Sequence, residues 1–241
     1  MKFRKAMFPS LFTIFNMFAG FMAVVEIYHG GYITACWLIF SAAVFDGMDG
    51  KLARLIGNST EFGVEFDSLA DVISFCLAPS FLVYRLYAVD LGVIGAIIAF
   101  FPLMFGSIRL ARFNVQTTPN PIPYFIGLPT PINAVALISF PLFNFASGNG
   151  AGDAKIMLPY MVCLAFLMVS HVPYAKMPRL TFKDDTRNTV RLIGIILSIV
   201  LIIIFRSRAL LVLSFLFILG GIIRWMAGTE EDEQVVKPLT K

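Results

Sequence analysis

Long apolar runs, separated by short joints that contain polar residues, glycine or proline, account for most of the chain. All but one of the runs have about 20 residues, which is the length of a helix that crosses the hydrocarbon core of a bilayer, and the run 191–205 is shorter. The runs are residues 8–28, 32–53, 63–86, 89–110, 125–147, 154–172, 191–205 and 209–227. The pattern therefore predicts an all-α, polytopic membrane protein with eight transmembrane helices.

The composition excludes a water-soluble protein. The 241 residues are 58% hydrophobic and 14% charged, with a mean hydropathy of +0.82, whereas a soluble domain carries about 25% charged residues. The net charge of +4 does not indicate nucleic-acid binding, because basic residues of membrane proteins gather in cytoplasmic loops beside anionic lipid. The three cysteines form no CxxC pair, so neither a zinc site nor a disulfide framework is predicted.

Basic residues are concentrated in every second joint, which predicts the orientation in the membrane. The basic segments are the N-terminus, the joints 51–62, 109–122 and 174–191 and the C-terminal tail, while the joints 28–31, 87–92 and 147–155 contain one basic residue. By the positive-inside rule, both termini and the three basic joints lie in the cytoplasm of a cell bounded by this membrane. Arg206 and Arg208, between the last two runs, are the exception to this alternation.

Four aspartates lie within apolar sequence, where ionised side chains are costly and indicate function. On a helix, Asp46 and Asp49 share one face at a spacing of three residues. The next run repeats this arrangement, since Gly63, Asp67 and Asp71 follow one another at steps of four. Two acidic helix faces joined by a short turn can face each other near the cytoplasmic ends of their helices.

Converging carboxylates repel one another unless cations lie between them. Oxygen ligands without histidine or cysteine suit Mg²⁺, Mn²⁺ or Ca²⁺ better than zinc. Two such cations can bridge the oxygens of a pyrophosphate, so the aspartates indicate phosphoryl chemistry at a membrane surface. A structural polar network, a proton path and a cation transporter remain alternatives for buried carboxylates.

The full spacing of these residues is Asp46-x2-Asp49-Gly50-x2-Ala53-Arg54-x8-Gly63-x3-Asp67-x3-Asp71. It resembles the signature of the CDP-alcohol phosphotransferase family at every defined position. The apolar pattern predicts a loop and a two-helix transmembrane hairpin over 176–228 and a polar cytoplasmic tail over 229–241. The resemblance implies that the preceding residues 1–175 form a six-helix transmembrane core. It also implies a nucleotide-activated donor and a hydroxyl acceptor.

The resemblance assigns roles to the acidic residues. One metal would be held by Asp46, Asp49 and Asp67, and a second by Asp46, Asp67 and Asp71. Asp71 resembles the proposed general base of the family. The expected cofactors are two divalent cations, Mg²⁺ or Mn²⁺, with Ca²⁺ as another possible occupant.

The donor, CDP-diacylglycerol, is expected to contact a second set of residues. Those implied by the resemblance are Gly50, Ala53, Arg54, Thr60 and Gly63. Small residues admit the nucleotide, and the Arg54 guanidinium can pair with phosphate. Asn16, on the first helix, is expected either to reach the donor or to hydrogen-bond to another helix.

Two later segments concern the acceptor. IRLARFNVQTTPNPIPYFIGLPTPINA, residues 108–134, and LMVSHVPY, residues 167–174, are similar to the family members that transfer a phosphatidyl group to L-serine. Arg109, Arg112 and Asn114 are candidates for binding this acceptor, because a serine carboxylate requires a cation.

Other acceptors and another origin of the basic residues remain open. Glycerol 3-phosphate or inositol phosphate would also require cations, and the two arginines also fit ordinary positive-inside charge. An archaeal-type lipid donor is compatible with the signature. The expected partners are CDP-diacylglycerol, L-serine, membrane lipids and a second copy of the chain in a homodimer, with no nucleic acid.

Overall fold

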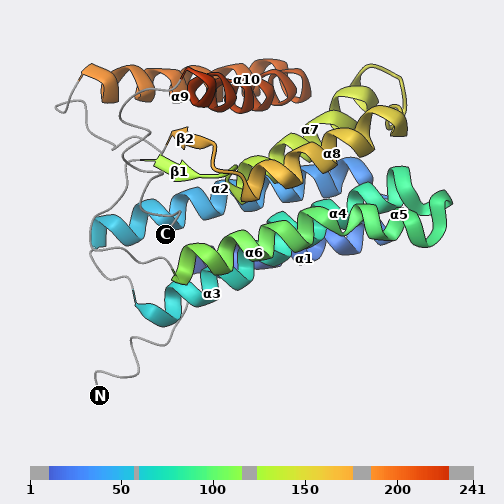
Figure 1. Ribbon diagram of the computed structural model, residues 1–241, viewed down its shortest axis with the longest axis horizontal. Coiled ribbons are helices and arrows are strands. Elements are labelled where there is room, and N and C mark those ends of the chain that lie inside the picture. The colour runs from blue at the N-terminus through green and yellow to red at the C-terminus, as the bar shows by residue number, and fades with distance from the viewer. Residues whose placement is uncertain (1–10, 57–59, 116–123, 176–185, 228–241) are drawn as a thin grey trace.

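The computed structural model describes residues 11–56, 60–115, 124–175 and 186–227, and this part of the chain is almost entirely helical (Figure 1). The α-helices are α1 (Leu11–Tyr28), α2 (Tyr32–Ile56), α3 (Glu61–Asp71), α4 (Ala78–Val83), α5 (Gly92–Ala99), α6 (Phe101–Val115), α7 (Thr130–Ala146), α8 (Ala154–Val169), α9 (Thr186–Phe205) and α10 (Ser207–Met226). The π-helices η2 (Val72–Leu77) and η3 (Tyr84–Ala88), the 3₁₀ turn η4 (Val89–Leu91) and the strands β1 (Tyr124–Ile126) and β2 (Pro173–Ala175) complete the described elements.

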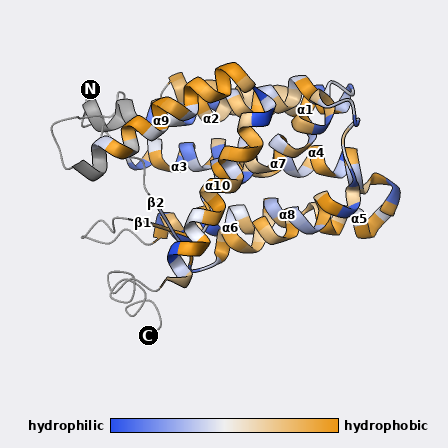
Figure 2. Ribbon diagram, turned by 90° about the horizontal axis from the view of Figure 1, so that it is seen from above, coloured by the Kyte–Doolittle hydropathy of each residue, from blue (hydrophilic) through white to orange (hydrophobic). Residues whose placement is uncertain are grey.

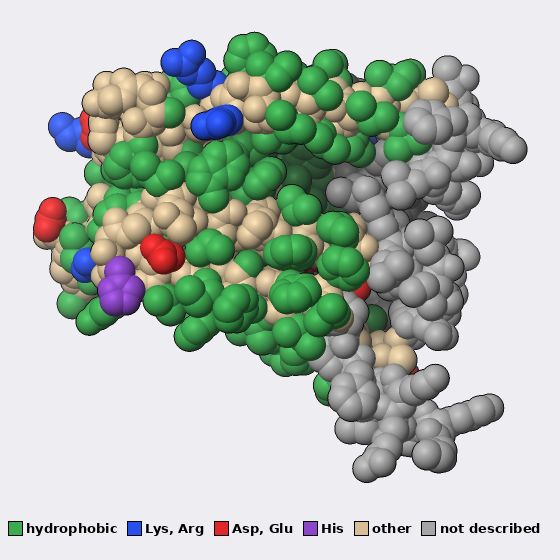
Figure 3. Space-filling model, turned by 180° about the vertical axis from the view of Figure 1, so that it is seen from behind, with side chains coloured by type: hydrophobic (Ala, Val, Ile, Leu, Met, Phe, Trp, Pro, Cys, Tyr) green, Lys and Arg blue, Asp and Glu red, His purple; other side chains and the backbone are tan. Residues whose placement is uncertain are grey.

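The helices are long and apolar enough for a polytopic membrane protein. Four described segments meet the length and hydropathy of membrane spans: Leu11–Tyr28, Tyr32–Gly50, Glu61–Val115 and Ser207–Met226. Apolar residues follow most of the length of the helices (Figure 2), and hydrophobic side chains cover most of one face of the molecule (Figure 3). The chain is an integral membrane protein, and the predicted all-α class is confirmed.

The long segment Glu61–Val115 consists of two antiparallel crossings. From α3 to η3 the chain runs as one continuous helical rod, because each element follows the previous one without a break. Gly92, with φ of +57°, adopts a conformation that glycine tolerates best, and here the chain turns back into α5 and α6 (Figure 1). The third and fourth predicted helices are therefore present, and α6 extends five residues beyond the predicted end at 110.

Successive helices reverse direction, so the joints lie alternately at two ends of the molecule. The end where α2 stops and α3 starts also holds the end of α6, the start of α7 and the strands β1 and β2 (Figure 1). The turn between α1 and α2 lies at the opposite end. This is the alternation that the basic joints predict, although the basic residues of both termini and of 176–185 lie outside the described residues.

A two-stranded antiparallel sheet was not predicted. Phe125 pairs with Tyr174 in its centre. Next to the sheet, Gly127 N donates to Val172 O and Leu128 N donates to Leu167 O, both at 2.9 Å. These bonds join the start of α7 to the end of α8, so α7 begins at Thr130 and not at the predicted residue 125.

The C-terminal helices pack on the other helices. α10 packs along α7 and also contacts β2, and Gly221 of α10 lies against the Tyr174 ring. α9 begins at Thr186, five residues before the predicted start, and its 20 residues approach the length of a membrane crossing. The predicted hairpin of two helices is therefore present at residues 186–226.

Candidate active site

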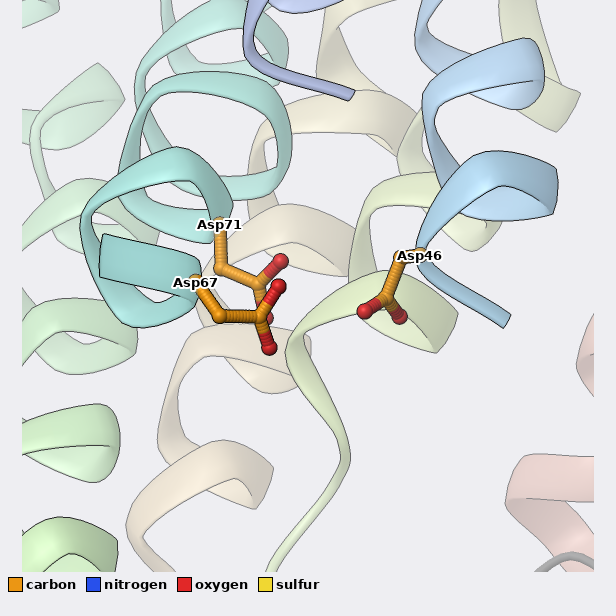
Figure 4. Close-up of side chains that lie close together, drawn as sticks. All are labelled: Asp46, Asp67 and Asp71. Carbon is orange, nitrogen blue, oxygen red and sulfur yellow. The ribbon is translucent and has the colours of Figure 1, made fainter. Parts of the chain in front are cut away.

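Three of the four signature aspartates converge between two helices. Asp46 projects from α2, while Asp67 and Asp71 project from α3 toward it (Figure 4). One carboxylate oxygen from each lies within 4.8 Å of those of the other two. The predicted convergence of two acidic helix faces is present in the structure.

The local helix geometry explains why both α3 aspartates face α2. Asp67 and Asp71 are one turn apart, so they lie on the same side of the helix. Immediately after Asp71 the helix widens into η2, and such π-helical turns recur at functional sites. η2 turns Ser74, Phe75 and Cys76 into the protein interior.

Burial makes the site electrostatically costly. Asp71 is buried, and Asp46 and Asp67 are half-buried. Asp67 Oδ1 is inaccessible and has no hydrogen-bond partner among the described residues. Three close carboxylates with an unsatisfied buried oxygen fit a hard divalent cation, since oxygen ligands and negative charge are what Mg²⁺ and Mn²⁺ require.

Asn16 of α1 contacts the candidate base. Asn16 Nδ2 donates a hydrogen bond to Asp71 Oδ1 at 3.2 Å, and Ser74 Oγ donates to the Asn16 carbonyl at 2.9 Å. α1 approaches η2 closely because Gly20 has no side chain: an added Cβ would lie 2.7 Å from Ser74 Cα. The helix-to-helix hydrogen bond expected for Asn16 is thus present, and its acceptor is the candidate base.

Asp49 is oriented differently from the other three. Its Oδ2 accepts a hydrogen bond from the Thr13 hydroxyl of α1, and the group of carboxylates within 4.8 Å does not include it. Asp49 is nevertheless close enough for its charge to act on Asp46 and Asp67. Its role as a metal ligand stays a prediction.

The candidate nucleotide contacts are described in part. Gly50 is half-buried on α2, but the side chains of Ala53 and Arg54 lie outside the described residues. Thr60 is the N-cap of α3, and its Oγ1 accepts a hydrogen bond from Gly63 N at 3.1 Å. Thr60 and Gly63 therefore define the start of the helix that presents two aspartates.

The three residues predicted to bind the acceptor differ in burial and in their contacts. Arg109 is half-buried, its guanidinium carbon lies 6.0 Å from the centroid of the Phe125 ring, and its charge interacts with that of Asp71. Arg112 is exposed. Asn114 Nδ2 donates to Glu65 Oε2 at 3.1 Å and to Ser68 Oγ at 3.0 Å, so it connects the end of α6 to α3.

Sequence reasoning missed three supporting residues: Thr13, Gly20 and Ser74. A signal was present for two of them, because Thr13, Asn16 and Gly20 follow one another at steps of three and four on α1. All three residues of this α1 face are buried. Ser74 carries no such signal, because its direction depends on the π-helical widening of η2.

This site belongs to a class of membrane-embedded phosphotransferases. The family model of CDP-alcohol phosphatidyltransferase matches residues 6–170, and the chain belongs to this family. Its members use divalent metals, and the aspartate cluster is compatible with that use.

Three similar proteins each cover 70% or more of the chain. The CDP-diacylglycerol--serine O-phosphatidyltransferase of Helicobacter pylori (strain ATCC 700392 / 26695) is 37% identical over 224 residues, 91% of each chain. The protein of the same name from Methanocaldococcus jannaschii is 30% identical over 217 residues, 90% of this chain and 92% of its own. Archaetidylserine synthase of Methanothermobacter thermautotrophicus is 35% identical over 170 residues, 70% of this chain and 69% of its own.

Proposed function

We propose that the protein transfers the phosphatidyl group of CDP-diacylglycerol to the hydroxyl of L-serine, producing phosphatidylserine and CMP. The observation that carries this proposal is the convergence of Asp46, Asp67 and Asp71 within 4.8 Å in a member of a phosphotransferase family. Membership of this family favours a transferase over the alternative of a cation transporter.

The names of the relatives support serine as the acceptor. The relatives from Helicobacter pylori and Methanocaldococcus jannaschii are named for CDP-diacylglycerol and serine, and the archaetidylserine synthase is named for an archaeal lipid and serine. All three relatives are therefore named for serine, although their names differ in the lipid. This favours serine over glycerol 3-phosphate and inositol phosphate more strongly than it favours one lipid donor.

The reaction breaks the phosphoanhydride bond of the donor's pyrophosphate and forms a phosphoester bond to serine. The serine hydroxyl oxygen attacks the phosphorus atom that carries diacylglycerol, and its proton passes to the Asp71 carboxylate. The bond between this phosphorus and the bridging oxygen breaks, and CMP leaves with that oxygen. Asn16 holds the carboxyl plane of Asp71 through the hydrogen bond to Oδ1, so the base is oriented before the acceptor arrives.

Asp46, Asp67 and Asp71 would hold one divalent cation, and Asp49 would join Asp46 and Asp67 in holding a second. Bound cations compensate the negative charge of the pyrophosphate. Arg54 and the small residues Gly50 and Ala53 would bind the nucleotide, with Thr60 and Gly63 shaping the adjacent end of α3.

We place the active-site end of the molecule at the cytoplasmic face. All but four of the 19 Lys and Arg residues belong to the termini, joints and helix ends assigned to that end, the four being Arg85, Lys155, Arg206 and Arg208. Such an excess of basic residues favours a cytoplasmic position. Both termini would then be cytoplasmic, and CMP would be released into the cytoplasm.

A panel of acceptors tests the proposal. Purified protein in detergent micelles is incubated with CDP-diacylglycerol, Mg²⁺ or Mn²⁺ and either serine, glycerol 3-phosphate or inositol phosphate, and the lipid product is identified by mass spectrometry. We expect phosphatidylserine to be the main product and chelation of the metal to stop its formation. A preference for either phosphorylated acceptor would contradict the proposed specificity.

A further inference from the structure

The first turn of α7 carries two buried polar side chains with no hydrogen-bond partner in the described part of the chain. Thr130 is 1% exposed and Asn133 is 0% exposed. Among the residues that the structure describes, neither Thr130 Oγ1 nor either amide atom of Asn133 has a hydrogen-bond partner. Because the two residues are three positions apart, they lie on neighbouring parts of one helix face.

The helix that begins with this turn packs against the elements that carry or adjoin the aspartates. α7 packs against α2, which carries Asp46, and against η2, which follows Asp71 directly. In Figure 4 the yellow-green start of α7 lies behind the carboxylate of Asp46.

Arg109 borders the same region from α6. A Cβ on Gly106, one turn before Arg109, would lie 3.6 Å from Thr130 Cγ2 and would also meet the Cys76 thiol. The charges of Asp71 and Arg109 both act on that thiol. Thr130 is therefore next to the buried region that the proposed base and Arg109 share.

An unpaired buried carboxamide is costly, because its donors and acceptor lose water and gain no partner. Other polar residues of α7 avoid this cost. Ser139 Oγ donates to Ala136 O at 2.8 Å, and Asn144 Nδ2 donates to Phe140 O at 2.9 Å. A helix that satisfies these groups but leaves Thr130 and Asn133 unpaired points to a ligand for its first turn.

We propose that Thr130 and Asn133 bind the charged groups of the amino-acid acceptor, an inference that rests on the proposed function. The Thr130 hydroxyl and Asn133 Nδ2 donate to the carboxylate, together with the Arg109 guanidinium. Asn133 Oδ1 accepts a hydrogen bond from the ammonium group. The positive end of the α7 dipole favours the carboxylate in this position.

The carboxamide also provides specificity. An α-amino acid presents both a carboxylate and an ammonium group, and a carboxamide has both a donor and an acceptor to match them. The phosphate group of glycerol 3-phosphate or inositol phosphate has no ammonium donor. With these acceptors Asn133 Oδ1 would lose the charged ammonium donor and could pair only with a neutral hydroxyl, which disfavours them.

The test uses the full-length protein and side chains of similar shape. Thr130→Val and Asn133→Leu remove the polar atoms, Thr130→Ser retains the hydroxyl, and Ser139→Ala is the control on the same helix. Initial rates of CMP release are measured against serine and, separately, against CDP-diacylglycerol. We expect Thr130→Val and Asn133→Leu to raise the serine KM by about tenfold or more, since each loses a hydrogen bond to a charged group. The CDP-diacylglycerol KM should stay unchanged, and Ser139→Ala should resemble the wild type. Thr130→Ser should raise the serine KM less than Thr130→Val, because it retains the hydroxyl.

A second measurement does not depend on turnover. Saturating serine should raise the melting temperature of the wild type and of Ser139→Ala, and should have little effect on Asn133→Leu or Thr130→Val. A wild-type serine KM in both variants, with a melting temperature that still responds to serine, would overturn the inference and leave a buried water as the partner of these groups. Failure of the proposed function can be told apart from failure of this inference, because in the first case the wild type itself would form no phosphatidylserine.

Discussion

Asn16 of α1 and Asp71 of α3 are 55 residues apart in the sequence, and a hydrogen bond of 3.2 Å joins their side chains. Two further contacts join α1 to η2, the element that follows Asp71. Ser74 holds the Asn16 carbonyl, and Gly20 lets α1 approach η2. The orientation of the proposed base therefore depends on the packing of the first helix.

Asn16→Leu should slow the reaction while leaving the fold intact. The leucine fills the same space, but Asp71 loses the donor that holds its carboxyl plane. We expect kcat to fall by about tenfold or more, as part of the contribution that general-base catalysis makes. The kcat is measured from steady-state CMP release, and Asn144→Leu at the far end of α7 is the control. A rise in the CDP-diacylglycerol KM at constant kcat would instead make Asn16 a donor contact.

Substitutions of the individual aspartates should lower the rate of turnover to different extents. Asp46→Asn and Asp67→Asn should each abolish turnover, because each removes a ligand assigned to both cations. Asp71→Asn should lower the rate by about 10² to 10⁴ if it acts as the base, and it should retain more donor binding. Asp90→Asn, an exposed aspartate at the opposite end of the molecule, should be neutral. Near-normal CMP release by Asp46→Asn or Asp67→Asn would contradict the metal assignment.

Gly20→Ala should destabilise the protein. The new methyl group would overlap the backbone of Ser74, and overpacking of this kind costs about 1–3 kcal/mol. Gly194→Ala is the matched control, because nothing lies within 4 Å of a Cβ at that helical position. Thermal unfolding in detergent should show a lower melting temperature for Gly20→Ala alone. Equal melting temperatures for the two variants would mean that α1 can move away from η2 freely.

The two arginines should have unequal effects on the acceptor. Arg109 interacts with Asp71 and lies near the Phe125 ring, whereas Arg112 is exposed. Arg109→Lys should raise the serine KM, because the guanidinium fork is lost while the charge remains. Arg112→Lys should leave it unchanged, and the donor KM should be constant in both. An unchanged serine KM in Arg109→Lys would assign this residue to ordinary positive-inside charge.

The sequence predicts the acidic core of the site because its cause is local. Asp67 and Asp71 share a helix face through their spacing, and a short joint returns the chain from α2, so this acidic face can meet Asp46. The contact between Thr13 and Asp49 depends on which face α1 turns to α2. Helix spacing does not determine that choice.

Other parts depend on contacts between distant segments. The strand β1, which precedes α7, pairs with β2 from beyond α8, and helix periodicity does not predict this pairing. Asn114 follows the two arginines in sequence but is held by Glu65 and Ser68 of α3. The expected homodimer and the division at residue 175 stay predictions, although α10 packs directly on α7.

The transfer of a phosphatidyl group to the serine hydroxyl is tested most directly by following the oxygen atom of that hydroxyl. L-serine labelled with a heavy oxygen isotope in its side-chain hydroxyl is incubated with CDP-diacylglycerol and the wild-type protein, and both products are analysed by mass spectrometry. Attack of this hydroxyl on phosphorus predicts phosphatidylserine that retains the label, with one unlabelled CMP released for each lipid formed. Release of CMP without labelled phosphatidylserine would show that the serine hydroxyl is not the acceptor.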